Sequence, residues 1–107
     1  MDIETLIKKQ IADNSVILYM KGTPQFPQCG FSARTVEALT QVGEPFAYVN
    51  ILENPEIRST LPRIANWPTF PQLWVKGELI GGCDIVMDMV QKGELAPLIK
   101  EALVKAE

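Results

Sequence analysis

Residues 15–20, "SVILYM", constrain the fold more than any other segment of the chain. They form a short, continuous apolar run rich in β-forming residues, which is typical of a strand covered on both faces of a sheet. From Phe31 onward the apolar positions follow one helical face, which stops at Gly43, and a second strand-like run occupies residues 46–51. A strand, a helix and a strand over this length predict a βαβ unit with parallel strands and the first strand central in the sheet.

Two further helices are predicted around this unit. The segment "MDIETLIKKQIADN" places its apolar side chains on one helical face and has no continuous apolar core of signal-peptide length, so we interpret it as a docked helix and not as a targeting signal. Asn54 and Pro55 are typical of an N-cap and of the first helical position. Pro62 is expected to shorten or kink the helix that they start.

A hairpin and two helices complete the chain. The strand-like segments "QLWV" and "ELIG" flank Lys76 and Gly77, a two-residue turn whose glycine suits a positive φ. Asp84 is a plausible N-cap for the helix "IVMDMVQK", Gly93 ends that helix, and a last amphipathic helix follows. The sequence therefore predicts an α/β fold, with a four-stranded mixed sheet flanked by helices, in one domain over residues 1–107.

Charge and cysteine content exclude several classes of partner. The formal net charge is −3 and the ten Lys and Arg residues are scattered, so nucleic acid and anionic lipid are not expected partners. No apolar run approaches the length of a membrane span. Two cysteines and no histidine cannot supply four soft metal ligands from one chain, and this low cysteine content is typical of a reducing compartment, so we expect a cytoplasmic protein.

Cys29 is the main candidate for chemistry. It lies where a proline-containing loop, residues 22–28, meets the start of a helix. Unpaired backbone N–H groups and the helix dipole lower a thiol pKa at such positions from about 8.5 to about 3.5–7.5, and Lys21 would add a positive charge nearby. The thiolate can act as a nucleophile or as a metal ligand. The alternative, an inert buried thiol, fits poorly between a proline loop and a helix start.

Ser32 stands three residues after Cys29, where a redox pair would have its second cysteine. It can donate a hydrogen bond to the thiolate, or it can serve only the first turn of the helix. Because a serine cannot resolve a mixed disulfide, an outside thiol or Cys83 would have to complete any exchange reaction.

Three more motifs suggest a ligand site. A cis peptide bond between Phe70 and Pro71 would present the Phe70 backbone to an extended peptide, although a trans proline that opens a strand is the commoner arrangement. In "GGCD" the glycines allow close approach of a ligand, the helix start suits a carboxylate, and Asp84 suits an amine. Lys21 and Arg58 would hold a second carboxylate. Each motif alone also fits a turn, an N-cap or a solvated charge.

Four motifs in a fixed order support a resemblance to a known family. "KG" closes the first strand, "CGFS" follows the loop "GTPQFPQ", "WPTFP" precedes the hairpin and "GGCD" follows it. With these motifs nearly the whole chain resembles the monothiol glutaredoxins of the CGFS type, and it is most similar to the short, single-domain bacterial members. The resemblance implies a thioredoxin-like fold, a cis bond before Pro71 and a glutathione site.

The resemblance also implies residue roles and partners. By this resemblance, the principal function of the protein would be to assemble, store and transfer a labile [2Fe-2S] cluster. The cluster would be bound at a homodimer interface through Cys29. A BolA-type protein and iron–sulfur recipient proteins would be the partners. Such a cluster needs four thiolates, which two chains and two glutathiones supply; Cys29 and Cys83 from each of two chains also reach four. The glutathione site carried over by position consists of Lys21, Arg58, the Phe70 backbone, Cys83 and Asp84.

Three functional hypotheses follow, and whether the protein is an enzyme stays open among them. The first is an iron–sulfur carrier in which Cys29 is a ligand. The second is a glutathione-dependent oxidoreductase in which Cys29 attacks a mixed disulfide, although the loop with Pro24, Phe26 and Pro27 would hinder the second glutathione. The third is a thioredoxin-fold interaction module without redox chemistry.

Overall fold

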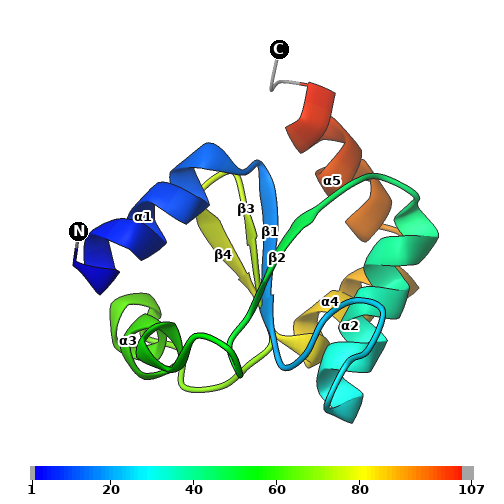
Figure 1. Ribbon diagram of the computed structural model, residues 1–107. Coiled ribbons are helices and arrows are strands. Elements are labelled where there is room, and N and C mark those ends of the chain that lie inside the picture. The colour runs from blue at the N-terminus through cyan, green and yellow to red at the C-terminus, as the bar shows by residue number, and fades with distance from the viewer. Residues whose placement is uncertain (1, 105–107) are drawn as a thin grey trace.

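The computed structural model describes residues 2–104 and contains helices and strands in the predicted order (Figure 1). Met1 and residues 105–107, which the single-domain prediction includes, lie outside this described part. The elements are α1 (Ile3–Asp13), β1 (Val16–Met20), α2 (Gly30–Val42), β2 (Ala47–Asn50), α3 (Pro55–Ala65), β3 (Gln72–Val75), β4 (Glu78–Gly81), α4 (Cys83–Gln91) and α5 (Leu95–Val104).

Strand β1 is central, as the apolar run predicted. The strand order is β2-β1-β3-β4; β1 pairs parallel with β2 and antiparallel with β3, and β3 pairs antiparallel with β4 in the predicted hairpin. Alternate side chains of β1 belong to two cores: Val16, Leu18 and Met20 lie in one, and Ile17 and Tyr19 lie in the other. Figure 1 shows α1 and α3 on one face of the sheet and α2, α4 and α5 on the other. The mixed four-stranded sheet is therefore confirmed.

The helix that begins at Asn54 and Pro55 differs from prediction in two respects. Asn54 occupies the N-cap position, but its side chain makes no capping hydrogen bond and donates to the Asn50 carbonyl oxygen (2.9 Å). The helix also continues through Pro62 to its C-cap, so Pro62 does not shorten it, and a kink, the other predicted effect, stays a prediction. Proline removes its own N–H donor, but the Pro62 carbonyl still accepts from the N–H groups of Asn66 and Trp67 at the helix end.

The start of α4 also corrects a prediction. Gly82, and not Asp84, is the N-cap, so Asp84 lies within the first helical turn. A Cβ at Gly82 would lie 3.2 Å from the Pro71 carbonyl oxygen, a close approach that favours glycine at this cap. The carboxylate of Asp84 is thereby free for other contacts. Across the described chain, no helix has the length and apolar character needed to cross a membrane.

Candidate functional site

A pocket of about 710 Å³ brings the five predicted ligand residues together. This volume lies within the range typical of small-molecule sites, about 300–1,000 Å³. The five lie on four different parts of the fold, namely the end of β1, helix α3, the segment before β3 and the start of α4. They are Lys21, Arg58, Phe70, Cys83 and Asp84.

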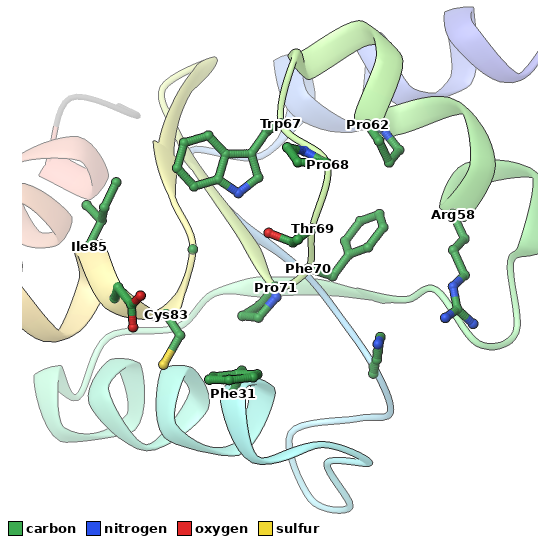
Figure 2. Close-up of a pocket in the computed structure, with 13 residues that line it drawn as sticks. Phe31, Arg58, Pro62, Trp67, Pro68, Thr69, Phe70, Pro71, Cys83 and Ile85 are labelled. Carbon is green, nitrogen blue, oxygen red and sulfur yellow. The ribbon is translucent and has the colours of Figure 1, made fainter.

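The pocket lies between two helices. Figure 2 shows Arg58 on one side, Cys83 and Ile85 on the opposite side, and Phe70 with Pro71 between them. The Phe70–Pro71 peptide bond is cis, as the resemblance implied.

Unpaired charges line this pocket at several points. Among residues 2–104, neither Lys21 nor Arg58 forms an ion pair, and neither does Asp84. Two cations and one carboxylate are therefore available to a ligand. They match a molecule that carries carboxylates and an amine.

Cys29 is the N-cap of α2, and its sulfur accepts a hydrogen bond from the Ser32 N–H (3.3 Å). The residue is half-buried. It does not line the pocket itself, but Lys21 and Phe31 do. The sulfur therefore lies at the start of a helix, beside residues that face the pocket.

Ser32 has two roles at once. Its side chain is buried, its Oγ accepts from the Lys21 N–H (3.1 Å), and the Cys29 Sγ lies 3.4 Å from the same oxygen. Because Oγ uses a lone pair for the Lys21 N–H, its own proton is available to a Cys29 thiolate. The two alternatives for Ser32 are therefore compatible, since it both organises the first turn and faces the sulfur.

The pKa of Cys29 is lowered from its ordinary value. Burial raises this pKa, but hydrogen bonds from the Ser32 side chain, the Ser32 backbone and the Phe31 backbone lower it, and so does the charge of Lys21. The lowering contributions exceed the effect of burial. Cys29 thus has a larger thiolate fraction at neutral pH than an ordinary cysteine.

Ser32→Ala is expected to raise the pKa of Cys29, so that alkylation by iodoacetamide at neutral pH slows and its pH midpoint moves upward. It also leaves the Lys21 N–H without an acceptor, which should lower the free energy of unfolding by about 1–3 kcal/mol. The control is Ser59→Ala on α3, whose exposed hydroxyl bonds only to its own helix. An unchanged pH midpoint in the Ser32 variant would contradict this role.

The loop before Cys29 is compact. Thr23 and Phe26 exchange backbone hydrogen bonds (3.3 and 3.0 Å), and the Gln28 N–H donates to the Lys21 carbonyl oxygen (2.9 Å). Gly22 has φ +94°, which glycine adopts without steric cost. The Phe26 side chain is 75% exposed at the tip of this loop.

Sequence reasoning missed several residues that line the pocket: Phe31, Pro62, Trp67, Thr69 and Ile85. The motifs "CGFS" and "WPTFP" contain three of them, Phe31, Trp67 and Thr69, so a signal existed. For Pro62 and Ile85 the sequence contains no signal of a binding role beyond their positions in predicted helices. Trp67 also has a buried Nε1 with no hydrogen-bond partner within residues 2–104.

Comparisons with known proteins give the family. The model of the glutaredoxin family matches residues 16–80. The chain is 67% identical over 99 residues to glutaredoxin 4 of Haemophilus ducreyi, covering 92% of each chain. It is 65% identical over 99 residues to glutaredoxin 4 of Escherichia coli strain K12, covering 92% of this chain and 86% of the relative.

Comparison with solved structures supports the same family. This structure matches the solution structure of reduced poplar apo GrxS14 with a TM-score of 0.81 and 44% sequence identity, covering 95% of this chain and 94% of the other. The thioredoxin-like fold expected from the resemblance is therefore confirmed. By family model, sequence and fold, this chain belongs to the glutaredoxin family.

Proposed function

We propose that this chain is a monothiol glutaredoxin of the CGFS type that binds glutathione and carries a labile [2Fe-2S] cluster at a homodimer interface. The supporting observation is the pairing of Cys29, a half-buried thiol with a lowered pKa, with an adjacent pocket of matching charge. Ser32 replaces the second cysteine of a dithiol site, so Cys29 cannot close a local disulfide.

The pocket supports glutathione as the ligand. Glutathione carries a carboxylate and an amine at its γ-glutamyl end and a second carboxylate at its glycine end. The start of α4 has a glycine N-cap without a side-chain cap, which leaves N–H groups for the first carboxylate, and Asp84 would accept from the amine. Lys21 and Arg58 would hold the second carboxylate, and the Phe70 backbone would pair with the peptide between them.

The number of available thiolates supports a shared cluster. Cys83 is only 6% exposed, which leaves Cys29 as the accessible sulfur of each chain. Within residues 2–104, no three His, Cys, Asp or Glu side chains form a group that could hold a metal ion. Two chains and two glutathiones supply the four ligands. Because two of these ligands diffuse freely, the cluster would be readily passed on, which suits assembly, storage and transfer.

The carrier hypothesis also predicts which partners the protein has and in which compartment it acts. We expect a BolA-type protein and iron–sulfur recipient proteins as partners. Both cysteines are free thiols, which agrees with a reducing, cytoplasmic location.

The lowered pKa of Cys29 also favours a second candidate function, glutathione-dependent thiol–disulfide exchange. The thiolate would attack the glutathione sulfur of a protein–glutathione disulfide, breaking the S–S bond and releasing the protein thiolate. A second glutathione thiolate would then attack the Cys29–glutathione disulfide, releasing oxidised glutathione and regenerating Cys29. Robust turnover of a small mixed disulfide would favour this function over the carrier.

Anaerobic reconstitution tests the carrier proposal. With ferrous iron, sulfide and glutathione, the chain is expected to become coloured and dimeric, with about one iron and one sulfide per chain. The same mixture without glutathione should yield little cluster, since two ligands are missing. Iron and sulfide assays, the visible spectrum and the native mass provide the measurement. A colourless monomer in the complete mixture would overturn the proposal.

A further inference from the structure

Asn50, the last residue of β2, connects the loop before Cys29 to the rest of the fold. Its side-chain Oδ1 accepts from the N–H of Gly22 (2.9 Å) and from the N–H of Leu52 (3.0 Å). Its Nδ2 donates to Glu53 Oε1 (3.1 Å). The Leu52 contact is an ordinary local turn, whereas the Gly22 contact spans 28 positions of sequence. The side chain therefore joins two loops that only the fold brings together.

The Asn50 backbone makes a second connection, toward α3. Its carbonyl oxygen accepts from Asn54 Nδ2 (2.9 Å) and from the Glu53 N–H (3.2 Å). The Asn54 carbonyl in turn accepts from the Arg58 N–H (3.0 Å), one turn into α3. A short chain of hydrogen bonds thus runs from Gly22 through Asn50 to the helix that carries Arg58.

These contacts matter because Lys21 precedes Gly22 directly. The Lys21 N–H donates to Ser32 Oγ, and the Lys21 carbonyl accepts from the Gln28 N–H. Ser32 belongs to α2 and Gln28 to the loop before Cys29. The contact between Gly22 and Asn50 ties the same segment to the sheet. Without it, the Lys21 segment would keep its bonds to the loop but lose its side-chain anchor on β2.

We propose that Asn50 is a positioning residue that fixes where Lys21 presents its charge to the pocket beside Arg58. The effect on ligand binding rests on the proposed glutathione site. The effect on the Gly22 amide does not, because its hydrogen bond to Asn50 belongs to the fold itself.

The test compares Asn50→Ala with Asn54→Ala. Both variants lose hydrogen bonds of the same connection, but only the first frees the Gly22 N–H. Asn50→Ala is expected to weaken glutathione binding by about fivefold to tenfold in calorimetry, since fewer molecules hold Lys21 in place. It should also shift the backbone amide NMR signals of Lys21 and Gly22, which report the position of this segment. Asn54→Ala should change neither value.

Further variants keep the test decisive. Asn50→Asp retains the acceptor, so hydrogen exchange at the Gly22 amide should stay slow in this variant and become fast in Asn50→Ala. If the alanine variant does not fold, Asn50→Ser, whose side chain is too short for the Gly22 contact, replaces it. Wild-type glutathione affinity in the truncated variant would overturn the inference. If the wild-type protein itself does not bind glutathione, the proposed function fails, and the Lys21 amide signal together with Gly22 amide exchange then decides whether Asn50 positions this segment.

Discussion

Cys29→Ser is expected to abolish cluster formation, whereas Cys83→Ser should leave the reconstituted cluster in place. A serine hydroxyl stays protonated at neutral pH and is a poor ligand for iron, so each chain would lose its accessible sulfur. Cys83 is buried at the start of α4, where its expected role is to line the proposed glutathione pocket. Visible absorbance and iron content after anaerobic reconstitution measure both effects.

The same pair of variants separates the two sets of cluster ligands. If two glutathiones complete the cluster, Cys83→Ser retains at least most of the iron, and omission of glutathione removes it. If Cys29 and Cys83 of two chains are the four ligands, Cys83→Ser loses the cluster and glutathione is dispensable. Loss of iron in the Cys83 variant, with folding intact by circular dichroism, would therefore count against glutathione ligation.

The fold was predictable because its strongest signals are local. The apolar run of β1 predicted a strand buried on both faces, and alternate side chains of that strand do enter two cores. The predictions failed where backbone contacts overrode residue preference. Asp84 is a good N-cap by type, but the approach of Gly82 to the Pro71 carbonyl places the cap two residues earlier.

The candidate site was predictable only in part, because some of its contacts join segments that are distant in sequence. Short motifs and a resemblance predict five ligand residues, and one pocket contains all of them: Lys21, Arg58, Phe70, Cys83 and Asp84. The sequence places Asn50 only within a strand, because its bond to Gly22 links segments that are distant in sequence. Contacts of this kind leave no periodicity or spacing from which they could be predicted.

Gly22→Ala is expected to be among the most damaging single substitutions near the site. An added Cβ would lie 2.5 Å from the Phe26 carbonyl oxygen and 2.8 Å from the Gln28 backbone nitrogen, both of which are backbone atoms that cannot rotate away. The positive φ of Gly22 adds conformational strain for alanine. Together, strain and overpacking should lower the free energy of unfolding by about 2–5 kcal/mol, measured by urea denaturation.

Gly43→Ala is the matched control for this prediction. Gly43 has a similar φ, +85°, at the C-cap of α2, but no atom beyond its two chain neighbours lies within 4 Å of its added Cβ. In Gly43→Ala, conformational strain alone should therefore lower the free energy of unfolding, by about 1–2 kcal/mol, and Cys29 alkylation should stay at the wild-type rate. Gly22→Ala should in addition slow that alkylation, because the loop that joins Lys21 to Cys29 has to rearrange. Equal destabilisation by the two substitutions would show that conformation alone, and not the close packing of this loop, requires glycine at position 22.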